Sequence, residues 1–123
     1  MANELRVRAR IDYNPATEDS LSTEWLEKFI SMTGTEFIHG VQSIGLTEEA
    51  ITVIADIATV GFCIFRNLDS TNFVEIGLAD VVADDARPIK LKAKEFALFR
   101  ANGTLYALAD TAACRLEYWI FED

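Results

Sequence analysis

The sequence predicts an all-β chain that folds as an antiparallel β-sandwich of the jelly-roll type. Two observations lead to this fold class. The second half of the chain consists of short runs rich in Phe, Ile, Val, Leu and Tyr, and clusters of turn-forming residues separate these runs at regular intervals. No run in that half has the length of a long helix. Short strands at regular spacing are typical of sandwiches and jelly rolls.

The first expected strand covers residues 5–13, where apolar or aromatic side chains alternate strictly with charged ones. Successive side chains of a strand point to opposite faces. One face should carry Leu5, Val7, Ala9, Ile11 and Tyr13, and the other Arg6, Arg8, Arg10 and Asp12. Asn14 and Pro15 should end the strand, because proline cannot donate to a ladder and restricts the residue before it.

The next segment, "LSTEWLEKFISM" at residues 21–32, fits two interpretations. Trp25, Leu26, Phe29 and Ile30 have the spacing of an amphipathic helix, with Ser22 or Thr23 as its N-cap. Residues 29–33 also fit a strand. One short helix near residues 22–31 therefore remains an alternative to a strand.

From residue 36 onward we expect strands. "EFIHGVQSI" and "AITVI" are short and β-branched, and Gly40 and Gly45 interrupt them. The later runs are "VGFCIFRNL", "NFVEIGL", "PIKLKA", "EFALFR", "TLYALA" and "ACRLEYWIFED". A length of 123 residues suits one domain. We therefore expect a single β-sandwich domain over residues 1–123, with the N-terminal strand, about residues 4–13, as a docking arm.

The stretch "FRNLDSTNFVEIG" concentrates oxygen-bearing side chains between two of these strands. Asn67, Asp69, Ser70 and Asn72 suit a tight connection, because such residues hydrogen-bond their own backbone or tolerate left-handed angles. A calcium loop would need more carboxylates and a glycine for its sharp turn. We therefore predict a structural hairpin turn that binds no ion.

Charge and composition argue against several classes of partner. A net charge of −9 repels phosphate backbones and anionic membranes, so we expect neither nucleic acid nor a membrane as a partner. No apolar run approaches the roughly 20 residues that span a bilayer, and "MANELRVRAR" lacks the apolar core of a signal peptide. We expect a soluble protein synthesised in a cytoplasm.

No pattern of reactive residues indicates an enzyme. His39 is the only histidine, and nucleophile elbows, phosphate-binding loops and dinucleotide-binding glycine patterns are absent. Cys63 and Cys114 lie far apart in apolar runs without a C-x-x-C motif, so we expect reduced, buried thiols. A disulfide would require neighbouring strands with suitable spacing. We therefore predict no catalytic residue, no metal ligand and no cofactor.

Apolar side chains on both faces of some strands indicate an interface. On the last strand, Cys114, Leu116, Tyr118 and Ile120 oppose Arg115, Glu117, Trp119 and Phe121. On "GFCIFR", Phe62 and Ile64 oppose Cys63 and Phe65. A second apolar face needs a cover, either the early segment around Trp25 and Phe29 or another chain. We predict an oligomer interface that includes Phe65, Trp119 and Phe121.

Three arginines on one side of the first strand form a second candidate contact. Arg6, Arg8 and Arg10 lie roughly 6.6–7 Å apart and should attract carboxylates. These could come from the chain's own segments Glu48-Glu49 or Asp84-Asp85, or from an acidic surface of another subunit. Arginine suits bidentate pairing at interfaces. We therefore include the three arginines among the predicted interface residues.

The closing half resembles a group of small tailed-bacteriophage and prophage virion proteins. The likeness covers about residues 61–123, where "GFCIFRNLDSTNFVEIG" is followed by "PIKLKAKEFALFRANGTLYALADTAACRLEYWIFED", with a weaker likeness in "HGVQSIG". In that group an "RNLD-x-TN" turn leads into "V-x-IG", and "LK-x-GE-x-A", "LYA" and "A-x-LEY" follow. This chain departs from the pattern at Lys94, where a glycine is expected before Glu95, and in the acidic stretch "LADVVADDARP".

The resemblance implies a structural protein of the virion, either a capsid decoration (cement) protein or an accessory part of the tail. As a decoration protein it would be a homo-oligomer, with a trimer favoured, on the capsid surface. Its partners would be the major capsid protein or other virion subunits. The alternative is a tail- or fibre-associated β-sandwich that binds a receptor or a carbohydrate. Phe73, Tyr106 or Trp119 could supply aromatic contacts for such a ligand.

Overall fold

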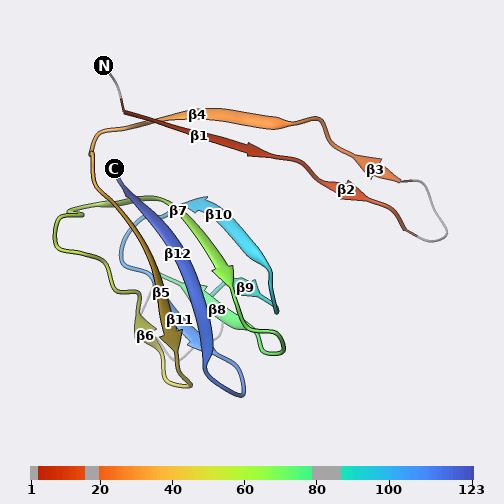
Figure 1. Ribbon diagram of the computed structural model, residues 1–123, viewed down its shortest axis with the longest axis vertical. Coiled ribbons are helices and arrows are strands. Elements are labelled where there is room, and N and C mark those ends of the chain that lie inside the picture. The colour runs from red at the N-terminus through yellow and green to blue at the C-terminus, as the bar shows by residue number, and fades with distance from the viewer. Residues whose placement is uncertain (1–2, 16–19, 79–86) are drawn as a thin grey trace. The chain divides into compact units, whose positions relative to one another are not determined.

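The computed structural model describes residues 3–15, 20–78 and 87–123, and every regular element in these ranges is a β-strand (Figure 1). The predicted all-β class is therefore confirmed. The chain divides into two compact units, Met1–Thr33 and Gly34–Asp123, where the sequence led us to expect one domain. The acidic pair Asp84-Asp85 and most of "LADVVADDARP" lie outside the described residues.

The first unit is a long antiparallel hairpin. Strand β1 (Asn3–Ala9) pairs with β4 (Leu26–Met32), and β2 (Asp12–Tyr13) pairs with β3 (Leu21–Ser22). Between the two ladders, Ile11 and Thr23 keep the strands joined: the Thr23 amide donates to the Ile11 carbonyl at 2.9 Å, and the Ile11 amide donates to Thr23 Oγ1 at 3.0 Å.

The helical alternative for residues 22–31 is wrong. Trp25, Glu27 and Phe29 alternate with Leu26, Lys28 and Ile30, so the segment also has the period of two that a strand requires. The ladder with β1 then supplies the interstrand hydrogen bonds that a short isolated helix would lack. Tertiary pairing thus decides between two local patterns of similar quality.

The second unit is a sandwich of two four-stranded antiparallel sheets. The large sheet has the order β10-β7-β12-β5, and the small sheet has the order β6-β11-β8-β9. The strands are β5 (Phe37–Ile44), β6 (Glu49–Ala50), β7 (Val60–Asn67), β8 (Val74–Gly77), β9 (Ile89–Leu91), β10 (Phe96–Arg100), β11 (Tyr106–Ala109) and β12 (Cys114–Glu122). Strands β7 to β12 confirm the six strands expected in the second half of the chain.

The segment "AITVI" is mostly not a strand, because only Ala50 belongs to β6. Ile51 instead enters the core beside the last residues of the loop before β11, where its amide donates to the Leu105 carbonyl at 2.8 Å. Ile51 and Val53 therefore pack on the core without extending a ladder, while Thr52 and Ile54 are exposed.

The hydrophobic core lies between the two sheets. From the large sheet it receives Ile44, Cys63, Phe65, Cys114, Leu116, Tyr118 and Ile120, and from the small sheet Val74, Ile76, Leu91, Ala107 and Ala109. The Phe65 ring stacks on Phe99, with ring centroids 5.6 Å apart. The placement of Phe65 at an interface is thus wrong. Its side chain is fully buried, since the period of two puts it on the face that the small sheet covers.

Both cysteines are reduced and buried, as predicted. They lie on the neighbouring strands β7 and β12, but Cys63 pairs with Ile120, six positions along the strand from Cys114. The two thiols are therefore separated by about 20 Å, too far for a disulfide. Burial raises the pKa of the Cys63 thiol to about 12, so this side chain behaves as a small apolar core residue.

The connection between β7 and β8 is not a hairpin. These strands belong to different sheets, so residues 68–73 form a corner that carries the chain from the large sheet to the small one. The sequence pattern identified the turn correctly but could not show that its two strands separate. The buried side chain of Asn67, described below, ties this corner to β9 through a hydrogen bond to the Leu91 carbonyl.

Candidate interaction surface

The outer face of the large sheet, which points away from the small sheet, is set by the strand registers. Trp119 pairs with both Ile64 and His39, and Leu98 pairs with Ile64, so these four side chains form one row across the sheet. The next row contains Phe96, Arg66, Glu117 and Val41. Phe121 pairs with Phe37 near the end of β12, and their rings stack at 5.8 Å.

This outer face is rich in exposed apolar side chains. Phe96 is 64% exposed and Phe37 is 59% exposed, and Val41 and Leu98 are also exposed. Trp119 and Phe121 are half-buried. The corresponding face of the small sheet instead carries the cross-strand pair Glu75 and Lys90. Leu108 and Tyr106 share that face of the small sheet but are half-buried, so the exposed large apolar side chains of the two sheets lie on the large one.

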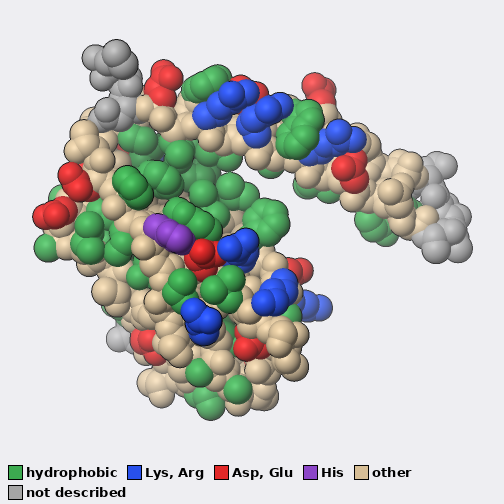
Figure 2. All heavy atoms as spheres, in the orientation of Figure 1, with side chains coloured by type: hydrophobic (Ala, Val, Ile, Leu, Met, Phe, Trp, Pro, Cys, Tyr) green, Lys and Arg blue, Asp and Glu red, His purple; other side chains and the backbone are tan. Residues whose placement is uncertain are grey.

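A polar cluster lies at the centre of this apolar face. Glu117 Oε2 and His39 Nε2 form a hydrogen bond of 2.9 Å, while Glu117 Oε1 accepts hydrogen bonds from the Arg66 guanidinium, at 2.8 Å from Nε. The His39 ring stacks on the Trp119 indole, with centroids 4.5 Å apart and planes 5° apart. Figure 2 shows the histidine in purple next to acidic and basic side chains, with hydrophobic side chains around them.

The cluster keeps Glu117 ionised although its side chain is largely buried. The hydrogen bond from His39 and those from Arg66 lower the pKa of the Glu117 carboxyl below its ordinary value and outweigh the effect of burial. Both carboxylate oxygens are thus occupied by partners within the face. The arrangement fixes the position of Trp119, whose ring also lies 5.9 Å from the Arg66 guanidinium carbon.

A shallow hollow of about 260 Å³ opens beside this cluster. Ile64, Arg66, Phe96 and Trp119 line it, so its walls combine two aromatic rings with one guanidinium. The other aromatic residues considered as ligand contacts lie elsewhere: Tyr106 belongs to the small sheet, and Lys90 Nζ lies 4.1 Å from the centroid of the Phe73 ring. Phe73, Tyr106 and Trp119 therefore do not form one groove.

The arginines of the first strand find their carboxylates inside the hairpin. Arg6 and Arg8 each lie 3.2 Å from Glu27, and Arg10 lies 3.2 Å from Asp12. The expected intramolecular alternative thus applies, but with different carboxylates. Glu48 instead pairs with the buried Arg87, and Asp84-Asp85 lies outside the described residues.

Aromatic rings occupy the same face of the hairpin. The Arg8 guanidinium carbon lies 4.9 Å from the centroid of Trp25, and that of Arg6 lies 5.6 Å from the centroid of Phe29. Cation–π contacts at exposed positions contribute about 0.5–1 kcal/mol each, and exposed ion pairs add little. The arginines are therefore held in place, with both charge and stacking partners, on an exposed surface.

The opposite face of the hairpin is apolar. Register pairs Leu5 with Ile30, Ala9 with Leu26, and Tyr13 with Leu21, while Val7 faces Lys28. Leu26, Tyr13 and Leu21 are each more than half exposed. A two-stranded hairpin is marginally stable in water by itself, so this face is a second surface that needs a cover.

The corner between β7 and β8 uses its oxygen atoms for structure. The buried Asn67 side-chain amide donates to the carbonyls of Asn72 at 2.9 Å and Leu91 at 3.0 Å, and its oxygen accepts from the Asp69 amide. Asp69 Oδ2 accepts from the amides of Asn72 and Thr71, and these bonds lower the pKa of its carboxyl. Among the described residues, no three His, Cys, Asp or Glu side chains are grouped so as to hold a metal.

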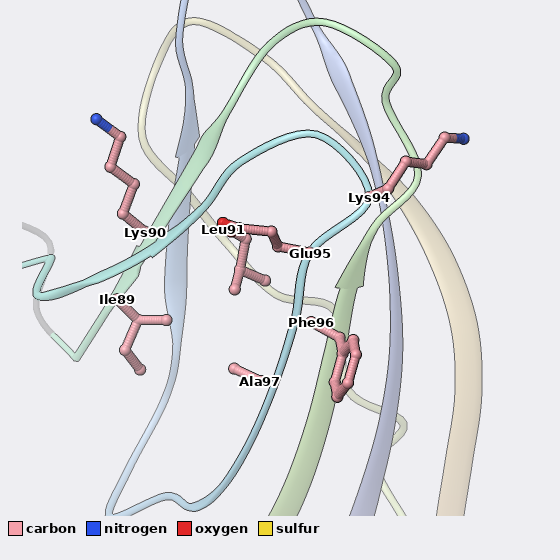
Figure 3. Close-up of a pocket in the computed structure, with 7 residues that line it drawn as sticks. All are labelled: Ile89, Lys90, Leu91, Lys94, Glu95, Phe96 and Ala97. Atoms are coloured by element: carbon pink, nitrogen blue, oxygen red, sulfur yellow. The ribbon is translucent and has the colours of Figure 1, made fainter. Parts of the chain in front are cut away.

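The turn between β9 and β10 borders a wide, open hollow of about 560 Å³ (Figure 3). In Figure 3 the side chains of Lys90 and Lys94 point away from it. Glu95, the acidic residue of its lining, already accepts a hydrogen bond from the Lys92 amide at 2.7 Å. The hollow marks the place where the edge strands of both sheets meet, and its polar groups do not converge on a ligand position.

Sequence reasoning missed the role of Glu122. Its Oε2 accepts hydrogen bonds from the amides of Thr35 at 3.2 Å and Glu36 at 3.3 Å, and Oε1 accepts one from the Ala58 amide at 3.4 Å. A Cβ added at Gly34 would lie 2.3 Å from Glu122 Oε2, so any side chain at this position would have to displace the Glu122 carboxylate. Nothing in the local pattern of an aromatic C-terminal strand points to this contact.

Comparisons with known proteins did not place the chain in a family. A scan against protein-family models, a search of curated proteins and a search of solved structures found no match. Among the described residues, no helix is long and apolar enough to cross a membrane.

Proposed function

We propose that this chain is a structural protein of a tailed-bacteriophage virion, a capsid decoration (cement) protein that acts as a homo-oligomer, with a trimer favoured. The observation that carries the proposal is the outer face of the large sheet, where exposed apolar side chains surround the cluster of Glu117, Arg66 and His39. The likeness of residues 61–123 to small virion proteins supplies the biological setting.

The outer face has the composition of a protein interface. Interface cores are enriched in aromatic residues and arginine, and a few well-packed residues carry most of the binding energy. Trp119 fits that role, because His39 and Arg66 hold its ring in place before any partner binds. Burying a large apolar side chain fully contributes about 1.5–3 kcal/mol. Several such residues on one face are therefore sufficient to support an oligomer.

Decoration would stabilise a capsid by linkage. A protein that binds only the assembled lattice lowers the free energy of that state and of no other. Contacts that bridge neighbouring capsomers would thus raise the temperature or force needed to separate them. This role requires surfaces that recognise proteins and requires no catalytic group, in agreement with the sequence-based expectation that the chain is not an enzyme.

The test combines oligomer mass with location in the particle. We expect light scattering to give a multiple of the chain mass for the wild type and a smaller mass for Trp119→Ala, while Tyr106→Ala on the small sheet serves as the matched control. Antibody labelling of purified virions should place the protein on the capsid surface. A monomeric wild type, or a protein absent from purified particles, would contradict the proposal.

A tail- or fibre-associated binding module is the second candidate. The hollow lined by Ile64, Arg66, Phe96 and Trp119 favours it, because an aromatic wall beside a guanidinium can contact a sugar ring and its hydroxyl groups. Titration with monosaccharides, followed by Trp fluorescence, separates the two roles. Saturable quenching that Phe96→Ala abolishes while the Trp119 reporter is kept, together with labelling of the tail, would favour the binding module.

A further inference from the structure

Strand β10 forms one edge of the large sheet, and among the described strands it pairs with β7 only. The Asn67 amide donates to the Glu95 carbonyl at 2.9 Å, so the residue just before β10 turns its backbone groups toward β7. Because hydrogen-bonded and non-hydrogen-bonded pairs alternate along an antiparallel ladder, Phe96, Leu98 and Arg100 turn theirs away from the sheet. No backbone group of the described residues bonds to these outward N–H and C=O groups. They are therefore available to a further strand.

The sequence of β10, "FALFR", lacks the features that usually protect an edge strand from pairing. It has no proline and no lysine, and its register with β7 is regular, without a bulge. Its one charge, Arg100, lies at the end of the strand and pairs with Asp123 at 2.7 Å. We infer that the edge of β10 binds an extended acidic segment of another protein, which joins the large sheet as a further antiparallel strand. This binding goes beyond the proposed function and does not require the proposed oligomer.

Two hollows lie along β10 on the side of the small sheet. Ala97 lines the larger one, of about 560 Å³, and Ala101 lines a second one of about 230 Å³. Ile89 of β9 lines both, so the two hollows border the edge strands of both sheets. An added strand would place every second side chain on the side of Ala97 and Ala101, over these hollows. Main-chain hydrogen bonds would then supply affinity, and the hollows would select side chains.

The second hollow favours an apolar side chain. Its walls are mostly apolar and include Leu78, Pro88, Ile89, Phe99, Ala101 and Leu105. Its lining guanidinium, that of Arg100, already has the Asp123 carboxylate as a partner. The bound segment should therefore carry an apolar residue opposite Ala101.

Positive charge gathers where β9 leads into β10, although the chain has a net charge of −9. Lys90 lies on β9, and Lys92 and Lys94 lie in the turn that follows. Lys90 faces Glu75 across the ladder and Lys94 Nζ donates to the Leu68 carbonyl at 2.6 Å, yet none of the three lysines forms an ion pair with a described carboxylate. In Figure 3, Lys90 and Lys94 point away from the larger hollow on opposite sides and leave it open. Carboxylates at the end of a segment that passes this turn would be attracted to these charges.

Amide hydrogen exchange of the full-length chain, followed by NMR, tests the strand addition. The probe is a short synthetic peptide of alternating Val and Thr that ends in three Asp, added at millimolar concentration. The amides of Phe96, Leu98 and Arg100 should exchange rapidly in the free protein and at least about 10-fold more slowly with the probe. The Glu122 amide donates to the Glu36 carbonyl, so by the same alternation His39 and Val41 turn outward on β5, the other edge. The amides of these two residues are the control and should not change.

Three results would overturn the inference. Slow exchange of the β10 amides in the dilute free protein would mean that the chain covers its own edge. Slowing that grows with protein concentration in the absence of probe would make a second copy the occupant. Failure of the probe to slow exchange, or equal slowing by a matched peptide that ends in three Lys, would remove the acidic segment as the ligand.

A proline on each edge strand locates the binding site. Leu98→Pro removes an outward N–H that makes no bond within the sheet, and proline is tolerated at such edge positions. Fluorescence anisotropy of the labelled probe should show binding at least about 10-fold weaker than to the wild type. Val41→Pro makes the same change on β5 and should leave binding unchanged. Equal effects of the two variants would contradict addition at β10.

Charge variants test the acidic character of the segment and need no change in the strand. Lys92→Gln/Lys94→Gln should weaken probe binding by about 3-fold to 10-fold at low salt and by little at high salt. Lys28→Gln, on the hairpin, is the control and should have no effect. Unchanged binding by the double variant would overturn the inference. Trp119→Ala, which tests the proposed oligomer, should leave probe binding intact, so either proposal can fail without the other.

Discussion

On the inner face of the large sheet, Cys63, Phe65 and Leu116 are fully buried, whereas on the outer face of the same sheet Phe37 and Phe96 are more than half exposed. Both faces are apolar in sequence, so hydrophobicity does not distinguish them. The difference is the small sheet, which covers the inner face alone. The small sheet thus accounts for the burial of one apolar face of this sheet and leaves the other uncovered.

The polar groups on the inner and outer faces of the large sheet also differ. The inner face buries Asn67, whose amide and carbonyl fix the corner between β7 and β8. The outer face carries Glu117, His39 and Arg66, which stabilise one another and orient Trp119. A buried polar group must be hydrogen-bonded to be tolerated. The Asn67 side chain therefore stabilises the fold. The outer cluster already satisfies both oxygens of the Glu117 carboxylate, so covering this face would leave neither oxygen without a hydrogen bond.

The largest effect should come from exchanging a phenylalanine for alanine on each face. Phe65→Ala leaves a cavity against Phe99 and Tyr118 and should lower the free energy of unfolding by about 3–5 kcal/mol. Phe96→Ala, the matched change on the outer face, should lower it by less than about 1 kcal/mol when the protein is dilute. Urea unfolding measures both. Equal losses would show that the outer face is as tightly packed as the core.

Removal of the inner polar group should have the second largest effect. Asn67→Ala leaves the carbonyls of Asn72 and Leu91 without their donor and should lower the free energy of unfolding by about 2–3 kcal/mol. The exposed Asn102 provides a control, since Asn102→Ala should change little. A small loss at Asn67 would mean that water replaces the side chain at the corner.

The dependence of stability on pH should show the contribution of the outer cluster of Glu117, His39 and Arg66. Hydrogen bonds lower the pKa of Glu117 below its ordinary value of 4.5, so the stability that its charge contributes is present above this pH and is lost as the pH falls through the lowered pKa. Thermal melts from pH 7 to pH 2 should show Glu117→Gln less stable than wild type at neutral pH, with the difference disappearing in acid. A difference that persists unchanged at pH 2 would assign the loss to packing.

How far the sequence predicted this molecule depends on the range of the interactions involved. Strict alternation identified β1, and short runs of β-branched and aromatic residues identified β5, β7 and β12, because both signals are local in the sequence. It could not assign Phe65 to the core or Trp119 to the surface, because only the position of the small sheet decides between two apolar faces. The contact of Glu122 with the amides of Thr35 and Glu36 was also invisible, since it joins residues far apart in the chain.

The hairpin shows the same limit. The alternation of apolar and polar side chains in residues 5–13 predicted the two faces of the hairpin correctly. The arginines also have carboxylate partners, as expected. Their partners, Glu27 and Asp12, could be named only once β1 was paired with β4 and β2 with β3. The local pattern thus predicts that the arginines need carboxylate partners, and strand register decides which residues provide those carboxylates.

The smallest effect is expected at Lys94, which belongs to neither face of the large sheet and so measures what backbone conformation contributes alone. Its φ of 66° lies in the left-handed region, where glycine is the residue that fits without a steric cost. A non-glycine residue pays about 1–2 kcal/mol there, while glycine adds an entropic cost of about 0.5–1 kcal/mol. The exposed hydrogen bond from Lys94 Nζ to the Leu68 carbonyl should add little. Lys94→Gly should therefore raise the free energy of unfolding by up to about 1 kcal/mol, whereas Lys92→Gly in the same turn should lower it by about 0.5–1 kcal/mol. If both variants lose stability equally in urea unfolding, the left-handed turn carries no strain.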